Sequence, residues 1–308
     1  MKNLLVVTLM SALCTAAHAE TIGFSMQRFD DNFLTLVRNG LETRAKAIGG
    51  VNVTTEDAQG DVSRQQSQIE NYIASKVDGI IVTPVDADAG VTISKMAAKA
   101  NIPVVFVNNQ PSNVNSLPAK QAFVGSNQIQ AGTFEAREVC RLLGGKGKAV
   151  ILEGDLGTVL TRERTQAVHD VFATEPCKGI TIVQEQSAHW DRTAALDLMS
   201  NWLSAGTDFN AVISNNDEMA LGAIQAMKSA GGMKKGVVVA GIDATQDAMA
   251  AMAAGELAVT VFQDANAQGV GAIDTVLNIA RGKPVEKKIF TTLELVTPKN
   301  MAQHTKKK

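Results

Sequence analysis

Polar side chains that can hold a small molecule follow the apolar, strand-like runs of this 308-residue chain. The clearest case is AVISNNDEMALG over residues 211–222, where a short apolar run ends in polar residues and apolar residues then recur with helical spacing. This pattern predicts a strand, a loop and a helix. Loops at the carboxyl end of a parallel strand meet the positive amino end of the next helix and collect ligand-binding groups. We therefore expect Asn215, Asn216 and Asp217 to face a crevice.

Hydrogen-bonding side chains stand at the other predicted strand ends as well, and two aromatic residues lie beside them. Each hydroxyl of a polyol donates and accepts, so carboxylates and amides can bind neighbouring hydroxyls while an aromatic face covers the C–H surface. This mixture predicts a polyol-binding cleft. Its candidate residues are Gln27, Asp31, Phe33, Asn108, Asn109, Arg164, Trp190, Asn216, Asp243 and Gln263.

Three of these candidates also fit ordinary structural roles, which the sequence leaves open. Asp31 precedes a predicted helix, and one carboxylate can both cap a helix and bind a ligand. Phe33 lies on the apolar stripe of that helix and fits a core position. Arg164 lies within another predicted helix and fits a solvated surface charge. Trp202 has apolar neighbours at helical spacing, so it is assigned to the core and not to the site.

Motifs for catalysis or cofactor binding are not found in the sequence. It contains no G-x-S-x-G elbow, H-E-x-x-H pair or G-x-x-x-x-G-K-[ST] loop. The run Gly144-Gly145-Lys146-Gly147 precedes a predicted strand, whereas a dinucleotide-binding loop follows one. We therefore expect no enzymatic activity, no cofactor and no metal site. A secreted α/β enzyme that acts on a small polyol remains the alternative from another class.

The first 19 residues have the pattern of a secretory signal peptide. Met1-Lys2-Asn3 precedes an apolar run over residues 4–14, and Ala17-His18-Ala19 forms an A-x-A cleavage site, so Glu20 is expected to begin the mature chain. The apolar run is too short to remain as a membrane anchor. Export as a soluble protein is therefore expected.

Composition predicts an ordinary globular protein without a nucleic-acid-binding surface. Of all residues, 45% are hydrophobic and 19% are charged, and the formal net charge is −2. Domains that bind nucleic acid are usually strongly basic. Single cores rarely grow beyond ~250–300 residues, and the mature chain is close to that limit. Two lobes are therefore expected.

Short β-rich runs alternate along the chain with longer segments of helical period. Such repeated strand-helix-strand units form parallel sheets with helices on both faces, so the predicted fold class is α/β. The expected strands are residues 21–26, 51–55, 79–82, 102–107, 148–152, 180–184, 211–214, 237–240, 257–263 and 289–296, and the expected helices are residues 33–47, 62–74, 91–100, 162–172, 193–203, 219–230 and 267–280.

The second half of the chain repeats the pattern of the first. Residues 77–84 correspond to residues 209–216, so two copies of one α/β unit are expected. A cleft then forms where the carboxyl strand ends of two hinged lobes converge. With a three-segment hinge, we expect an N-terminal lobe of residues 20–125 plus 264–291 and a C-terminal lobe of residues 126–263 plus 292–308.

Two cysteines, Cys140 and Cys177, remain after removal of the signal peptide. Each lies shortly before a predicted strand, and export places both in an oxidising compartment. A disulfide between them and two buried free thiols are both compatible with the sequence.

The whole mature chain resembles the ribose-binding family of periplasmic sugar-binding proteins. The segments NNDEMALGA over residues 215–223 and ANIPV over residues 100–104 carry the resemblance, supported by Arg162-Glu163-Arg164 and Trp190-Asp191-Arg192. The resemblance implies two Rossmann-like lobes of the type I periplasmic binding protein fold. It also implies that the ten candidate residues named above occupy the sugar-binding positions of the family.

Two positions depart from the usual pattern of the family and bear on the ligand. Leu34 stands where pentose binders usually have a second aromatic residue, and Asn109 stands where they usually have arginine. Residues 29–35 and 139–147 look most like the branch that binds inositols and rhizopine, an amino-inositol. An aminocyclitol would give Asp31 or Asp243 a cationic partner. The resemblance thus implies a cyclitol ligand, with ribose or another aldose as the alternative.

The resemblance also implies the cellular role. It predicts a monomeric, periplasmic solute-binding protein of an ABC importer, whose partners are a small polyol or sugar and a membrane permease. A chemoreceptor is a further partner compatible with this role. A sugar-responsive transcription regulator shares this kind of fold, but it needs an N-terminal helix-turn-helix where this chain has a signal peptide.

Overall fold

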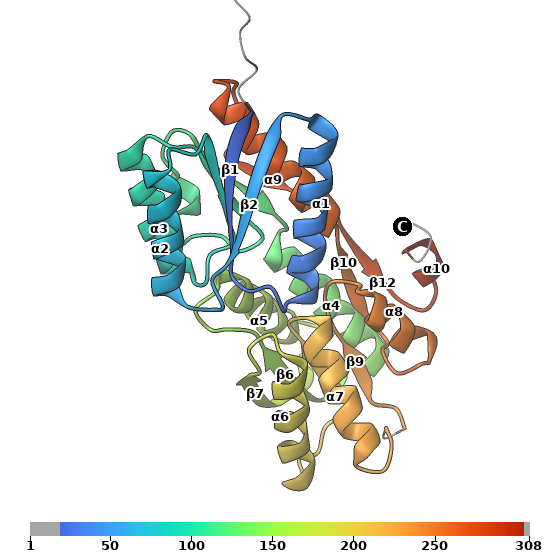
Figure 1. Cartoon of the computed structure of the whole chain (residues 1–308). Coiled ribbons are helices and arrows are strands. Elements are labelled where there is room, and N and C mark those ends of the chain that lie inside the picture. The colour runs from blue at the N-terminus through green and yellow to red at the C-terminus, as the bar shows by residue number, and fades with distance from the viewer. Residues whose placement is uncertain (1–18, 234, 305–308) are drawn as a thin grey trace, which may run out of the picture.

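A computed structural model describes residues 19–233 and 235–304, which form two α/β lobes arranged end to end (Figure 1). Residues 1–18, which hold nearly all of the predicted signal peptide, and the C-terminal tail over residues 305–308 lie outside the described residues. None of the described helices is both long enough and apolar enough to cross a membrane.

The first lobe is built on a parallel six-stranded sheet of order β11-β5-β4-β3-β1-β2. Alternate strand residues face opposite ways: Ile81 packs with α1 and α9, and Ile80 packs with α2 and α3. The elements are β1 (Glu20–Met26), α1 (Asn32–Ile48), β2 (Val51–Asp57), α2 (Val62–Ala74), β3 (Gly79–Val82), α3 (Ala87–Ala100), β4 (Val104–Val107), η1 (Val114–Ser116), β5 (Gln121–Gly125), α9 (Ala265–Ala280) and β11 (Lys288–Phe290).

The second lobe has a parallel sheet of order β7-β6-β8-β9, which two bridges, Ala240 to Val259 and Asp243 to Phe262, extend to β10. α6, α7 and α8 cover one face, and α4 and α5 cover the other. The elements are α4 (Gln128–Leu143), β6 (Lys146–Glu153), α5 (Val159–Phe172), β7 (Gly179–Ser187), α6 (Arg192–Ser204), β8 (Ala211–Ser214), α7 (Asp217–Ser229), β9 (Val238–Ala240), α8 (Gln246–Ala253), β10 (Thr260–Gln263), β12 (Leu293–Val296) and α10 (Met301–His304).

The two lobes share one strand order. The sequence β2-β1-β3-β4-β5 in the first lobe corresponds to β7-β6-β8-β9-β10 in the second, as the internal repeat predicts. In each lobe the five strands of this order are parallel, so their carboxyl ends lie at one edge of each sheet. These two edges face each other, and the loops that leave them form the boundary between the lobes (Figure 1).

Two parts of the structure differ from the sequence-based expectation. Residues 289–296, predicted as a single strand-like crossing between the lobes, instead contain two short strands, of which β11 pairs with β5 of the first lobe and β12 pairs antiparallel with β10 of the second. Helices α4 and α8 are not among the predicted elements. The buried face of α4 includes Gln128, Glu135 and Glu138, and these polar residues hide its apolar period.

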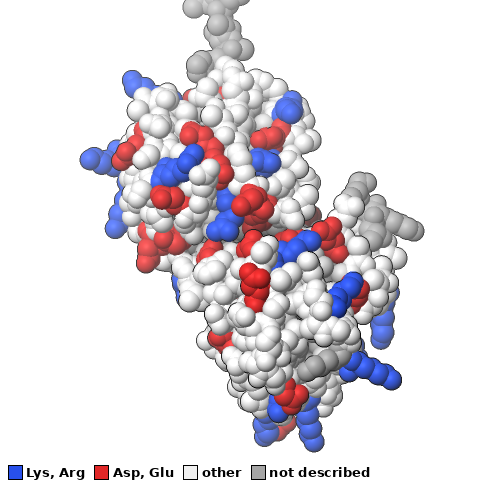
Figure 2. Space-filling model, turned by 60° about the horizontal axis from the view of Figure 1, so that its bottom comes forward, with Lys and Arg blue, Asp and Glu red and all other residues white. Residues whose placement is uncertain are grey.

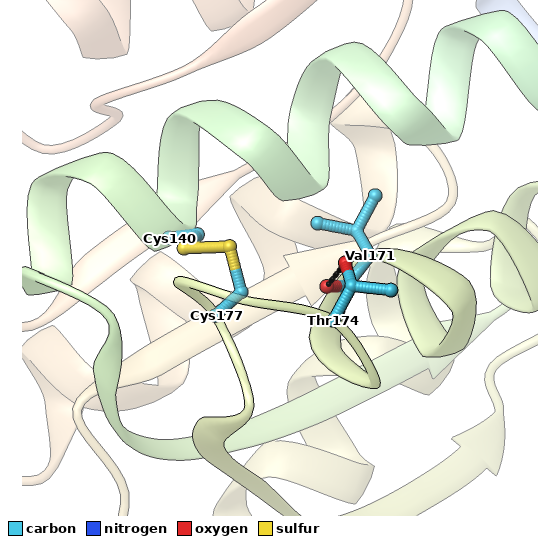
Figure 3. Close-up of a disulfide and its surroundings, with 4 residues drawn as sticks. All are labelled: Cys140, Val171, Thr174 and Cys177. Atoms are coloured by element: carbon cyan, nitrogen blue, oxygen red, sulfur yellow. Dashed lines mark hydrogen bonds between the residues drawn. A yellow bond between two sulfur atoms is a disulfide. The ribbon is translucent and has the colours of Figure 1, made fainter.

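A disulfide joins Cys140 of α4 to Cys177 in the loop after α5 (Figure 3). Of the two states left open by the sequence, the structure has the bonded one. Both cysteines lie in the apolar layer between α4, α5 and the sheet, and they are 3% and 5% exposed. In the same loop, the Thr174 hydroxyl donates a hydrogen bond to the Val171 carbonyl oxygen at 3.0 Å.

Removing the disulfide should lower the stability of the fold. The bond joins residues 37 positions apart, and the chain-entropy estimate for a loop of this length is about 3–4 kcal/mol. The Cys140→Ser/Cys177→Ser double variant should therefore unfold at a lower urea concentration than the oxidised protein, as followed by circular dichroism. Wild-type protein unfolded in reducing agent is the control and should match the variant. An unchanged midpoint would show that the bond does not contribute to stability.

Candidate ligand-binding site

The ten candidate residues line one cavity between the two lobes, together with Leu34 and Leu160. About 30 Å³ of this cavity is open to the centres of water-sized molecules. When the ~1.4 Å radius of a water molecule is added around that space, a rounded void has a volume on the order of 150 Å³. Such a void accommodates one six-membered ring with its hydroxyl groups, and it is too small for two linked rings.

Amide side chains of the first lobe are held in place by one another. Asn109 Nδ2 donates to Gln27 Oε1 at 2.7 Å and to the Pro84 carbonyl oxygen at 2.9 Å. Both amide hydrogens of Asn109 are thus used, and its carbonyl oxygen remains as an acceptor for a ligand. Asn108 has a φ of 62° and donates to Gln268 Oε1 at 3.2 Å. These contacts orient polar groups at the ends of β1 and β4.

Asp31 and Phe33 stand at the start of α1. Asp31 is the N-cap, and its Oδ1 accepts the Leu34 N–H at 2.8 Å. Burial raises the pKa of the Asp31 carboxyl, while the Leu34 N–H and the charge of Arg28 oppose this rise. Asp31 therefore caps the helix and also lines the cavity. Phe33 is 7% exposed, packs in the core of the lobe and reaches the same cavity.

Arg164 of α5 carries a buried positive charge in the second lobe. Only 2% of its surface is exposed, so the alternative of a solvated surface charge does not hold. Arg164 Nε donates to Gln128 Oε1 at 2.7 Å, and Nη1 donates to the main-chain oxygen of Asn215. Burial lowers the pKa of Arg164, and the nearby carboxylates, Asp243 foremost, oppose this effect. Its guanidinium carbon lies 5.6 Å from the ring centre of Trp190.

Trp190 is held by its backbone and by two neighbours from other strands. Its φ is 62°, and its main-chain oxygen accepts a hydrogen bond from Asn216 Nδ2 at 3.3 Å. Asn216 is also the N-cap of α7, where its Oδ1 accepts the Met219 N–H at 2.9 Å. Beneath the indole lies Gly154, where a Cβ atom would stand 2.0 Å from Trp190 Cε2. The sequence analysis missed Gly154, although a glycine directly after a strand is a signal for close approach.

Asp243 and Gln263 form a buried, hydrogen-bonded pair in the cavity wall. Gln263 Nε2 donates to Asp243 Oδ1 at 2.7 Å. Gln263 Oε1 is buried and has no hydrogen-bond partner among the described residues. Leaving such an acceptor unsatisfied costs roughly 1–3 kcal/mol, so this atom marks a place where a ligand would donate a hydrogen bond. Burial also raises the pKa of Asp243, and the charge of Arg164 opposes it.

Asn215 and Asp217 do not face the crevice, contrary to the expectation from sequence. Both are fully buried beneath the cavity. Asn215 Oδ1 accepts the Gly154 N–H at 3.2 Å, and Asp217 accepts hydrogen bonds from Thr245 and Thr260. Neighbouring side chains point in different directions as the chain leaves a strand. Of the three polar residues after β8, only Asn216 therefore lines the cavity.

The cavity wall can bind a polar ligand but holds few groups for catalysis. Its twelve residues include no serine, cysteine, threonine, histidine or lysine. Among the described residues, no group of three or more His, Cys, Asp and Glu side chains is placed to hold a metal ion. The wall has two carboxylates, Asp31 and Asp243, against the single guanidinium of Arg164. Its charge therefore favours a ligand that carries hydroxyl groups and a positive charge.

A further carboxyl, that of Glu135 on α4, lies fully buried below the site. Its Oε1 accepts the Ser214 N–H at 3.3 Å, and its Oε2 has no partner among the described residues. Burial raises the pKa of Glu135 to about 8, although the charge of Arg164 opposes the rise. At neutral pH the carboxyl therefore holds a proton in the folded protein and loses it on unfolding.

The protonation of Glu135 predicts a pH dependence of stability. Because the folded state binds one more proton than the unfolded state between pH 4.5 and about 8, the free energy of unfolding should fall across this window, by up to ~1.4 kcal/mol per pH unit. Glu135→Gln, which keeps an acceptor for Ser214, should flatten this slope and raise stability at pH 8. Urea unfolding from pH 5 to pH 8 measures both proteins, and equal slopes would contradict the assignment.

Gly154→Ala should displace the Trp190 indole and weaken ligand binding. A methyl group at this position overlaps the ring, so the tryptophan must leave the cavity wall. We expect at least a ~10-fold loss of affinity, which equals about 1.4 kcal/mol. Isothermal titration calorimetry of Gly154→Ala, Trp190→Ala and the double variant tests the mechanism. If the glycine acts through the ring, the double variant should bind no worse than Trp190→Ala, and additive losses would contradict this mechanism.

Comparison with known proteins agrees with this geometry. A family model described as a periplasmic binding protein domain matches residues 22–284. The chain is 60% identical over 289 residues to the "Putative rhizopine-binding protein" of Rhizobium meliloti, covering 94% of each chain. It is 34% identical over 279 residues to the ribose import binding protein of Bacillus subtilis, covering 91% of this chain and 88% of the relative.

Solved structures show the same relationship. An ABC transporter solute-binding protein from Bacillus halodurans, crystallised with bound myo-inositol, superimposes with a TM-score of 0.88 at 38% identity. The match covers 94% of this chain and 98% of that protein. The two-lobed arrangement of parallel sheets with flanking helices is thus the type I periplasmic binding protein fold. By sequence and by structure, this chain belongs to the periplasmic binding protein family.

Proposed function

We propose that the protein is the solute-binding component of an ABC importer and captures a cyclitol, an inositol or an amino-inositol of the rhizopine type. The charge of the cavity wall carries this proposal, because two carboxylates face one guanidinium in a space for a single ring. A ligand with several hydroxyl groups and one ammonium group would satisfy the amides and balance the charge. The named ligands of the relatives from Rhizobium meliloti and Bacillus halodurans support the same class.

The ten candidate residues take complementary roles in this proposal. Phe33 of the first lobe and Trp190 of the second would cover the C–H surface of the ring. The amides would bind hydroxyl groups, and Arg164 would donate to a hydroxyl oxygen. The ammonium group would lie at Asp243 and Gln263, where an acceptor is unsatisfied, or at Asp31. Leu34 in place of an aromatic residue leaves more room beside the ring, which favours a cyclitol over a flat pentose.

Closure of the two lobes around the ligand would create the form that a permease recognises. Contacts across the boundary include Asn32 Nδ2 to Glu218 Oε1 at 2.8 Å and the Ala87 N–H to the Gly157 oxygen at 3.1 Å. The proposed hinge lies at residues 125–126, 263–264 and 291–292.

On the face shown in Figure 2, acidic and basic side chains are interspersed over both lobes, which fits a monomeric protein that does not bind nucleic acid.

The proposed location is the periplasm, reached with the signal peptide of residues 1–19. Its membrane partner would be the cognate permease, and a chemoreceptor is compatible with the same closed form.

We further infer binding without turnover, since the cavity wall has no nucleophile beside a general base. Incubation with bound cyclitols followed by mass spectrometry should return the ligand unchanged. A new product would favour the secreted enzyme instead.

A calorimetric comparison of ligands tests the proposal. The mature protein should bind myo-inositol and an amino-inositol, scyllo-inosamine, more tightly than ribose, galactose or xylose. Asp243→Ala should weaken binding by at least ~100-fold, because it removes a charged acceptor and leaves donors unpaired. Asp243→Asn keeps the shape of the side chain and should weaken binding of the amine more than that of myo-inositol.

The control is Asp274→Asn, a partly exposed carboxylate of α9 that pairs with Arg44 and does not line the cavity, and it should bind as the wild type does. Preferential binding of an aldose would overturn the cyclitol proposal and leave the fold intact. Affinity within a few fold of the wild type in Asp243→Ala would show that the site is elsewhere.

A further inference from the structure

The turn that carries Asp243 has an unusual backbone. Asp243 has a φ of 130° and the next residue, Ala244, has a φ of 52°, and residues other than glycine rarely adopt such values. No glycine relieves this turn, and two consecutive strained residues persist only where the surroundings hold them. The turn follows β9, the fourth strand of the second lobe, and it presents the Asp243 carboxylate to the cavity.

Asp217 and Thr260, which lie outside the cavity wall, hold this turn from below. Asp217 Oδ2 accepts the Thr245 N–H at 2.8 Å, and Asp217 Oδ1 accepts the Thr260 hydroxyl at 2.8 Å. The Thr260 hydroxyl oxygen in turn accepts the Ala244 N–H at 3.1 Å. Both side chains are fully buried. The Thr260 hydroxyl therefore binds the N–H of Ala244, and the Asp217 carboxylate binds the N–H of the next residue, Thr245.

The backbones of Asp217 and Asp243 are hydrogen-bonded to neighbouring segments of the sheet. The Asp217 N–H donates to the Ile242 oxygen at 2.8 Å, and the Asp243 N–H donates to the Val261 oxygen at 2.8 Å. A Cβ atom at Gly241 would stand 2.5 Å from Asp217 Oδ1, which shows how closely the carboxylate lies under the chain. β10 thus supplies Thr260 to the backbone of the turn and Gln263 to the Asp243 carboxylate.

We infer that Asp217 and Thr260 are positioning residues for ligand binding, which hold the strained Asp243–Ala244 turn and thereby aim the Asp243 carboxylate at the ligand. The inference rests on the proposed function of Asp243 as a ligand-binding carboxylate. Without these bonds, the turn relaxes toward ordinary backbone angles and the carboxylate swings out of line with Gln263. Affinity then falls although neither residue lines the cavity.

Thr260→Val tests this inference, since it replaces the hydroxyl with a methyl group of the same shape. With scyllo-inosamine and myo-inositol as probes, calorimetry of the mature protein should show a ~10-fold or greater loss of affinity. Thr260→Ser restores the hydroxyl and should return affinity to within ~3-fold of the wild type. Should Thr260→Val fail to fold, Asp217→Asn serves instead, because asparagine has one acceptor oxygen in place of the two that accept from Thr245 and Thr260.

A double-mutant cycle separates positioning from general stabilisation. In the Asp243→Ala background there is no carboxylate to aim, so Thr260→Val should cause no further loss beyond ~2-fold. A merely structural role would instead add its full loss in both backgrounds. Thr83→Val is the matched control: Thr83 is fully buried in the first lobe, its hydroxyl has no partner among the described residues, and its loss should leave affinity within ~3-fold.

The outcomes distinguish the two proposals. A large loss with Asp243→Ala but wild-type affinity in Thr260→Val overturns the positioning role and leaves the proposed function standing. Equal losses from Thr260→Val with and without the Asp243 carboxylate also overturn it. Retained affinity in Asp243→Ala overturns the proposed site and the inference together.

Discussion

The buried positive charge of Arg164 is the interaction on which the site depends. A guanidinium is costly to remove from water, and this one has no carboxylate in direct contact among the described residues. It is stabilised by an amide, by a main-chain oxygen and by the field of surrounding acids. Asp243, Glu135 and Asp217 lie near enough to favour its charge, and its charge in turn opposes the rise in the pKa values of Asp243 and Glu135. The buried ionisable groups around Arg164 thus include more acidic than basic side chains.

This excess of buried acidic groups bears on whether the proposed site would bind a neutral polyol or an amine. The cavity wall has two carboxyls and a single base, and burial raises the pKa of both carboxyls, so a bound cation would favour their charged forms. A neutral polyol can use the amide groups and the aromatic faces, but only an amine also balances the charge. Size adds a second filter, since the void admits one ring. Under the proposed function, selectivity would follow from charge and volume together.

The backbone conformation of three residues in the cavity wall determines how their side chains are oriented. Asn108, Trp190 and Asp243 all have positive φ values and all line the cavity. Such strain persists only because the surrounding strands and hydrogen bonds hold it, as Gly154 does by leaving room for the indole. Helix caps and strand ends position the side chains of the site, as they do for the N-cap residues Asp31 and Asn216.

The sequence by itself determined the α/β class, the duplicated unit and ten of the twelve residues that line the cavity, because hydrophobic period and strand-end polarity are local signals and the family resemblance located the rest. It did not determine which of Asn215, Asn216 and Asp217 faces the cavity, the division of residues 289–296 into β11 and β12, the helix α4 with its buried acids, or the state of Cys140. Only the tertiary structure decided these, since burial, cross-lobe contacts and the support of a strained turn arise from residues far apart in the chain.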